Sequence, residues 1–131
     1  MIVLGYVRRP EGRAALERAI EETRPRDGHL MVVHSLRGPD DEDEYLEDRE
    51  DIENLEERLA GEGIPFTVRE YARGRSAPED LVAVANEVDA DMIVIGLRRR
   101  SPVGKFIMGS NAQSVLLHAD CPVLAVRTPE G

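Results

Sequence analysis

The fold is decided by one stretch of the sequence, MIVIG at residues 92–96, which is a short apolar run that closes at a glycine. Such a run is typical of a β-strand that is buried on both faces of a sheet. Similar runs occupy residues 2–7, 30–35 and 123–126. The sequence therefore predicts several buried strands that are spread along the whole chain.

The segments between these runs carry helical patterns. Apolar residues recur at helical spacing within residues 10–20, 40–62, 78–88 and 110–118. In the last of these segments we expect Ala112, Val115 and Leu116 to face inward. Residues 64–71 alternate more loosely and include charged residues, as expected for an edge strand. This alternation predicts an α/β fold over residues 1–131, as a single domain with an open five-stranded parallel sheet and helices on both faces.

The composition excludes several classes of protein. Apolar residues make up 41% of the 131 residues, which suits a folded domain rather than a disordered chain. No apolar run reaches the ~18–20 residues that a membrane-spanning helix needs, and the N-terminal run is too short for a signal sequence. Cys121 is the single cysteine, so the sequence allows neither an internal disulfide nor a cysteine metal cluster. We expect a cytoplasmic protein.

One segment accounts for the net charge of −9. Residues 40–62 hold 13 of the 26 acidic residues and two arginines, so the rest of the chain is almost neutral. The acidic average argues against binding to nucleic acid or to an anionic membrane surface. The simplest interpretation of the segment is the solvated face of a helix, whose apolar stripe consists of Tyr45, Ile52, Leu55 and Leu59. Because the sequence has one lysine, the composition also suggests a halophilic source.

A second charged segment has the opposite sign. Four basic residues fall within residues 98–105, between a predicted strand and a predicted helix. Ligands of open α/β sheets bind beyond the carboxyl ends of the strands, and a helix N-terminus attracts anions. Gly109 would allow a ligand to approach closely, and the Ser110 hydroxyl would either cap the helix or donate to a phosphate. Two interpretations stay open: an anion site, as for a nucleotide, or an ordinary helix cap beside solvent-exposed arginines.

No pattern in the sequence indicates catalysis. Residues 96–110 contain neither a Walker A loop nor a G-x-G-x-x-G motif. The histidines lack zinc-ligand spacing, and no metal site is predicted. We expect His34 to be structural, His118 to interact with its helix dipole, and Cys121 to be a packed thiol. The sequence does not exclude slow ATP hydrolysis, although no residue is placed to activate a water.

Three stretches carry a resemblance to a known family: the strand at residues 92–96, the pair Gly109-Ser110, and VLLHADCPVLAV at residues 115–126. On these stretches the whole chain resembles the universal stress protein family. The resemblance implies a strand order of 3-2-1-4-5 in a Rossmann-like fold of the adenine nucleotide alpha hydrolase-like type. It also implies a homodimer that pairs, across its axis, the residues Val123, Leu124, Ala125 and Val126.

The ATP-binding branch of the family carries a glycine signature that this sequence matches in part. Gly96 occupies the first position and Gly109-Ser110 the last two, but Arg99 replaces the middle glycine. Val7 replaces the aspartate that ATP-binding members place at the end of the first strand. Arg99 therefore either blocks the phosphate path or, together with Arg98, supplies charge-assisted hydrogen bonds to phosphates.

The resemblance thus implies a nucleotide site between the first and fourth strands, with Ser35 where the family packs the adenine. Its candidate residues are Val7, Ser35, Gly96, Arg98, Arg99, Gly109, Ser110 and Asn111. We expect a small stress-response module that binds ATP or AMP without a metal. The alternatives are a dimeric interaction module that binds no nucleotide, and an enzyme on a flavodoxin-like or nucleotide-hydrolase scaffold.

Overall fold

The computed structural model describes residues 1–35, 42–71, 77–97 and 109–128. The elements follow one another as β1 (Ile2–Gly5), α1 (Pro10–Thr23), the 3-10 helix η1 (Arg24–Arg26), β2 (Leu30–Ser35), α2 (Glu42–Gly61), β3 (Phe66–Tyr71), α3 (Ala77–Glu87), β4 (Met92–Leu97), α4 (Ser110–His118) and β5 (Val123–Arg127). The predicted alternation of strands and helices is confirmed.

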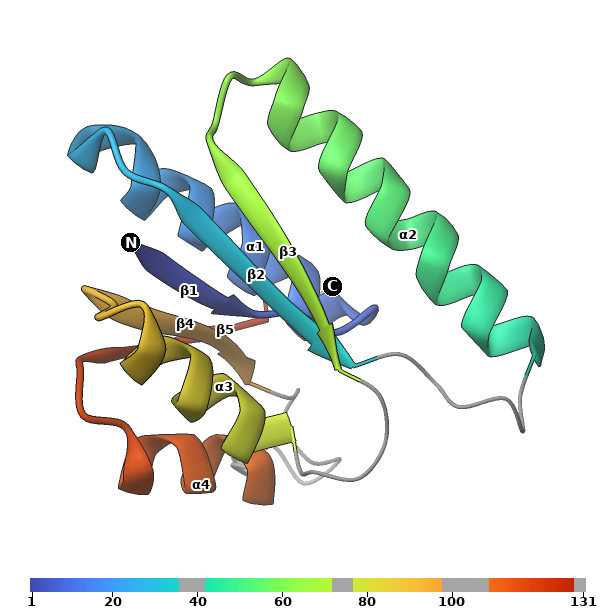
Figure 1. Cartoon of the computed structure of the whole chain (residues 1–131). Coiled ribbons are helices and arrows are strands. Elements are labelled where there is room, and N and C mark those ends of the chain that lie inside the picture. Colours follow the sequence, from blue (N-terminus) through green and yellow to red (C-terminus); the bar gives the residue numbers. More distant parts are fainter. Residues whose placement is uncertain (36–41, 72–76, 98–108, 129–131) are drawn as a thin grey trace.

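The five strands form one parallel sheet with the order β3-β2-β1-β4-β5. Figure 1 shows α1 and α2 on one face of this sheet, and α3 and α4 on the other. The predicted strand order and the two helical layers are therefore confirmed, as is the edge position of β3. Because all strands run in one direction, their carboxyl ends meet at a single edge, where ligands of such sheets bind.

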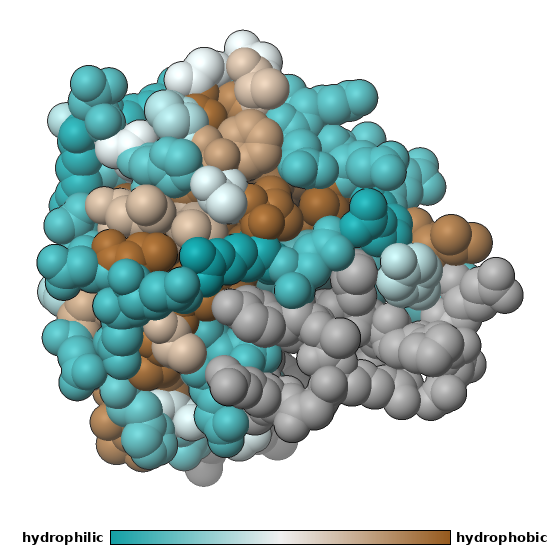
Figure 2. All heavy atoms as spheres, in the orientation of Figure 1, coloured by the Kyte–Doolittle hydropathy of each residue, from teal (hydrophilic) through white to brown (hydrophobic). Residues whose placement is uncertain are grey.

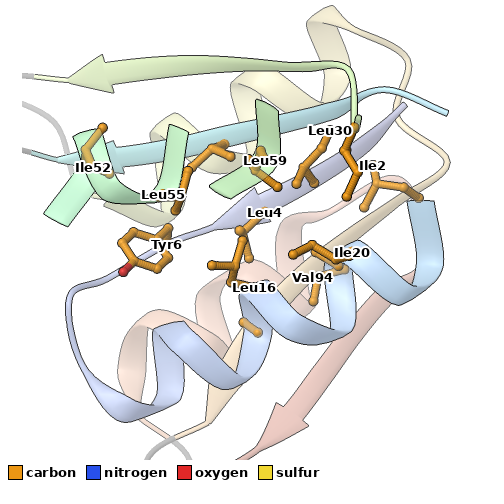
Figure 3. Packing of buried hydrophobic residues seen from close by; sticks show 14 residues of the cluster. Ile2, Leu4, Tyr6, Leu16, Ile20, Leu30, Ile52, Leu55, Leu59 and Val94 are labelled. Carbon is orange, nitrogen blue, oxygen red and sulfur yellow. The ribbon is translucent and has the colours of Figure 1, made fainter. Parts of the chain in front are cut away.

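Each face of the sheet has its own apolar core. On the side of α1 and α2, Leu4 of β1 belongs to one buried cluster with Leu16 and Leu55, as Figure 3 shows. On the side of α3 and α4, Val3 belongs to a second cluster with Val84. The face shown in Figure 2 is largely hydrophilic, with apolar residues near its centre and at a few places along its margins. Since burying one such side chain contributes about 1.5–3 kcal/mol, these clusters hold both helical layers on the sheet.

Several details of the sequence prediction are wrong. β1 ends at Gly5 rather than at Val7, and β4 continues past Gly96 to Leu97. Leu116 of α4, which we expected to face inward, is 41% exposed. The helix contacts α3, β4 and β5 and buries Val115, so its covered stripe is narrower than its apolar spacing suggests.

The acidic segment forms α2, and its apolar stripe is confirmed. Ile52, Leu55 and Leu59 are each at most 4% exposed, whereas Tyr45 is half-buried. The opposite face of the helix carries exposed acidic residues at helical spacing, namely Asp43, Glu50, Glu53 and Glu57. The helix is thus amphipathic in an extreme form, with an apolar side on the sheet and an acidic side in solvent.

Lowering the salt concentration is expected to destabilise the protein through this acidic face. Glu53 lies three residues after Glu50 and four before Glu57. Each like-charge pair at such a spacing destabilises the helix by about 0.2–0.5 kcal/mol when salt does not screen it. Thermal unfolding at low and high NaCl should show a melting temperature that rises by about 2–4 °C with salt. The Glu53→Gln variant should lose most of this dependence, and an unchanged salt dependence would contradict the explanation.

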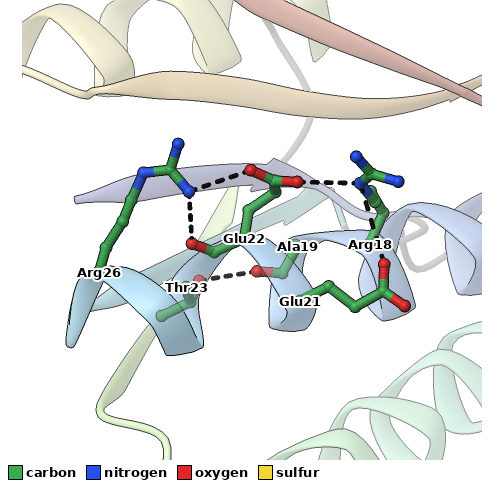
Figure 4. A network of polar contacts seen from close by, with 6 residues as sticks. All are labelled: Arg18, Ala19, Glu21, Glu22, Thr23 and Arg26. Atoms are coloured by element: carbon green, nitrogen blue, oxygen red, sulfur yellow. Dashed lines mark hydrogen bonds and ion pairs between the residues drawn. The ribbon is translucent and has the colours of Figure 1, made fainter.

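The far end of α1 is held by a surface network that Figure 4 shows. Arg18 and Arg26 both donate to the carboxylate of Glu22 at 3.0 Å. Arg26 also donates to the main-chain carbonyl of Glu22 at 2.7 Å, which closes the end of the helix. These arginines lie at the end of α1 that leads into β2, away from the carboxyl ends of the strands.

Candidate functional site

The carboxyl ends of β1 and β4 lie side by side in the middle of the sheet. The two strands are paired with Leu4 opposite Val94, so the chain leaves both of them at neighbouring points. Figure 1 shows the N-terminal end of α4 at this same edge, where the strand arrows end. The structure therefore brings three predicted parts of the site to one edge: Val7, Gly96 and the start of α4.

The remaining predicted residues of the site are Ser35 and the two arginines after β4. Ser35 ends β2, beside β1, and so reaches the same edge of the sheet. Arg98 and Arg99 follow β4 directly in the sequence and lie outside the described residues. Their place in the site stays a prediction.

The start of α4 has the properties of an anion-binding helix end. Gly109 is the N-cap, and because it is a glycine it has no side chain that could cap the helix. Ser110 is the first helical residue, so the alternative in which its hydroxyl caps the helix is wrong. The first helical bond runs from the N–H of Gln113 to the carbonyl of Gly109 at 3.1 Å. The three N–H groups of residues 110–112 therefore have no partner within the helix and carry its positive dipole end.

Gly96 has a packing role that the sequence reasoning missed. A Cβ at this position would lie 2.0 Å from the carbonyl oxygen of Glu11 in α1. Gly12 makes the second half of the contact, because a Cβ there would lie 1.8 Å from the carbonyl oxygen of Val7. The two glycines let the first turn of α1 lie directly against the ends of β1 and β4, beneath the candidate site.

The residues after β1 form a tight turn from Val7 to Arg9. The N–H of Arg9 donates to the carbonyl of Val7 at 2.8 Å, and Val7 itself is 47% exposed. Arg8 donates to Asp48 of α2 at 2.7 Å and lies 3.2 Å from Glu47. Arg8 is therefore engaged by the acidic helix α2.

A polar cluster beside β2 also escaped the sequence reasoning. His34 is 6% exposed, so its side chain is buried. It lies opposite Glu70, one of the charged residues of the edge strand β3. Tyr6 donates its hydroxyl to Asp51 of α2, and burial together with this carboxylate raises the pKa of Tyr6. The acidic run at residues 40–62 was the sequence signal for this cluster, because several of its carboxylates pair with polar side chains on or next to the sheet.

Other candidate groups have ordinary surroundings. Burial and the neighbouring Asp120 raise the pKa of the Cys121 thiol, which disfavours the reactive thiolate. His118 lies in the last turn of α4 with its Nδ1 2.8 Å from the carbonyl oxygen of Ser114. The described residues contain no group of three or more side chains placed to hold a metal ion. Among the helices described, none has the length and apolar character to cross a bilayer.

The model of one protein family, described as the universal stress protein family, matches residues 1–127. The chain belongs to this family. A universal stress protein of Mycolicibacterium smegmatis is 42% identical over 135 aligned residues, covering 100% of this chain and 99% of the relative. One from Thermus aquaticus is 33% identical over 96% of this chain and 97% of its own length.

Solved structures of universal stress proteins share the fold. A structure from Archaeoglobus fulgidus has a TM-score of 0.78 and 38% identity, covering 95% of this chain and 96% of that one. Another from Archaeoglobus fulgidus, in complex with dAMP, has a TM-score of 0.71 and 33% identity, covering 95% of each chain. The likeness extends over almost the whole of each protein, so the edge of the sheet described above is part of the shared fold.

Proposed function

We propose that this universal stress protein binds an adenine nucleotide at the carboxyl ends of β1 and β4. The observation that carries the proposal is the N-terminus of α4, whose first N–H groups have no acceptor within the helix and lie at the edge of the sheet where ligands of such folds bind. The basic residues at 98–105 precede this helix and add positive charge. A relative that is 33% identical was solved in complex with dAMP.

The site as proposed favours a ligand that brings negative charge and no metal. The phosphates would accept from the first N–H groups of α4 and from Arg98 and Arg99, because helix ends and guanidinium groups both favour anions. Ser35, Gly96 and Val7 would border the nucleoside, and the exposed Ser110 and Asn111 would lie next to the phosphates. With Val7 at the end of β1, the ribose would lack the carboxylate that ATP-binding members supply.

Calorimetric titration with ATP and with AMP tests this proposal. We expect binding of at least one nucleotide at submillimolar concentration, and the Arg98→Ala/Arg99→Ala variant should bind at least about tenfold more weakly through loss of charged hydrogen bonds. The control is Arg24→Ala/Arg26→Ala, which removes the same charge from η1 at the other end of α1. No heat at millimolar nucleotide would overturn the proposal, and equal weakening by both variants would show nonspecific charge attraction instead of a site.

The second candidate function is a dimeric interaction module that binds no nucleotide. The exposed apolar side chain of Val7 and the arginine in place of the middle glycine favour it. Under both candidates we propose a homodimer through β5, whose residues 123–126 are half-exposed along the edge of the sheet. We also propose a binding rather than a catalytic role, and a cytoplasmic location.

A further inference from the structure

The two halves of α2 are held on the sheet by different forces. In the C-terminal half, Ile52, Leu55 and Leu59 belong to the apolar cluster that α1 and the sheet share, as Figure 3 shows. The half formed by residues 42–51 is anchored through charged and polar side chains instead. Arg8 pairs with Asp48, and Tyr6 donates to Asp51. The contact of residues 42–51 with the sheet therefore depends on the charge states of the side chains that form it.

His34 lies at the centre of this polar contact. Its Nε2 is 3.6 Å from Oε1 of Glu70. Nη1 of Arg49, in α2, lies 2.5 Å from the same oxygen atom. The His34 side chain is 5% exposed, whereas that of Arg49 is 40% exposed. One carboxylate oxygen thus faces a buried imidazole and a partly exposed guanidinium at once.

Charged groups of β3 and α2 act on this histidine. Glu70 comes from β3, and Asp48 and Arg49 come from α2. On the side of β1, Arg8 pairs with Asp48, and Tyr6 lies beyond it on Asp51. Burial lowers the pKa of His34 and outweighs the two carboxylates, which act in the opposite direction, while Arg49 adds to the lowering. The folded protein therefore holds His34 neutral at pH 7.

We propose that His34, Glu70 and Arg49 form an acid-sensitive latch, which holds residues 42–51 of α2 against the sheet at neutral pH and releases them when His34 is protonated. At neutral pH the uncharged imidazole does not compete for Oε1 of Glu70, so Arg49 pairs with this oxygen and connects α2 to β3. A protonated His34 competes for that oxygen as a second cation. Since Arg49 is the more exposed of the two cations, it is the group that moves into solvent, and its ion pair with Glu70 breaks.

The direction of the effect follows from proton linkage. A histidine that is hard to protonate in the closed state binds protons more readily once α2 lifts and exposes it. Acidification therefore favours the open state, starting near the ordinary histidine pKa of about 6.5. One linked proton shifts the opening equilibrium by at most about tenfold per pH unit. Above that range the latch stays closed and is insensitive to pH.

Amide hydrogen exchange, corrected for intrinsic exchange rates, tests the latch without any nucleotide. Between about pH 7.5 and about pH 5.5, protection of residues 42–51 should fall by up to about tenfold in the wild-type protein. Protection of residues 52–61 should change by less than about twofold, because apolar contacts hold them. Equal protection of residues 42–51 at both pH values would overturn the proposal.

Two histidine variants and one arginine variant sharpen the result. His34→Gln keeps a neutral polar side chain and should abolish the pH dependence, whereas the exposed His118→Gln should behave like the wild type. Arg49→Gln should already show the lower protection at neutral pH, since its tie to Glu70 is gone. If His34→Gln retains the acid-induced loss, another group is responsible and the latch is wrong. If His34→Gln does not fold, an NMR titration of His34 in the wild-type protein decides the matter, and a pKa at or above about 6.5 would overturn it.

Discussion

Replacing Gly96 with alanine is expected to destabilise the protein by about 3 kcal/mol, or by about 10 °C in melting temperature. The added Cβ would lie 2.0 Å from the main-chain carbonyl oxygen of Glu11, and main-chain atoms cannot turn aside as a flexible side chain can. The first turn of α1 would have to move away from β4. Thermal and denaturant unfolding of the purified variant measure the loss.

The chain supplies a matched control for this substitution. Gly61, at the end of α2, has open space around the position of its missing Cβ, so Gly61→Ala should be neutral or stabilise by up to about 1 kcal/mol. Gly12→Ala should cost as much as Gly96→Ala, because its Cβ would meet the carbonyl oxygen of Val7. The double variant should cost less than the sum, since both changes disturb the same first turn of α1. A Gly96→Ala variant within about 0.5 kcal/mol of the wild type would contradict the packing role.

Replacing Ala125 with proline is expected to convert the proposed dimer into a monomer. In a parallel pair, alternate N–H groups of a strand point toward its neighbour. The N–H of Ile93 donates to Pro122 at 2.9 Å, and Ile93 lies opposite Val123, so the ladder uses the N–H groups of Leu124 and Val126. The N–H of Ala125 therefore points away from β4, toward the open edge. Proline removes this one donor and leaves the ladder to β4 complete.

Light scattering during size-exclusion chromatography measures the outcome directly. The wild type and Ala125→Val, which has a similar added volume but keeps the N–H, should both have the mass of a dimer. Ala125→Pro should have the mass of a monomer and an unchanged far-UV spectrum. A monomeric wild type over a range of salt concentrations would contradict the dimer, and a dimeric Ala125→Pro would place its interface elsewhere.

The sequence was sufficient for the sheet because buried parallel strands leave a strong local signal. The apolar runs around Val3, Val32 and Val94 have no other simple explanation, and the structure buries all three completely. Leu116 shows the limit of the same reasoning. Helical spacing says that one face of α4 is apolar, but it does not say how wide a stripe the neighbouring elements cover. The spacing therefore located the helix and missed the exposure of one leucine.

The parts of the site that sequence reasoning missed depend on contacts between distant segments. The sequence places Gly96 in a ligand loop. In the structure the position must be glycine because a Cβ would collide with a main-chain carbonyl oxygen of α1, 85 residues earlier in the chain. The charged residues within 64–71 indicate an edge strand and nothing more, yet one of them, Glu70, faces His34 and Arg49. Such pairings follow from register and layer packing, which no local pattern records. The start of α4 at Gly109 and Ser110 could be predicted because a helix N-terminus is itself a local feature.

The two edges of the sheet differ in a way that limits how many copies can join. On β3, Arg69 pairs with Glu87 of α3 and Glu70 pairs with Arg49 of α2, so charged side chains brace that edge on both faces. On β5, the residues from Val123 to Val126 are apolar and half-exposed. If two copies join by their β5 strands, each copy uses the edge that can pair with another strand. The β3 strands, whose charged side chains disfavour further pairing, then form the two outer edges of the continuous sheet. In the proposed dimer, growth would therefore stop at a closed pair, and no open apolar edge would remain for fibrous polymerisation.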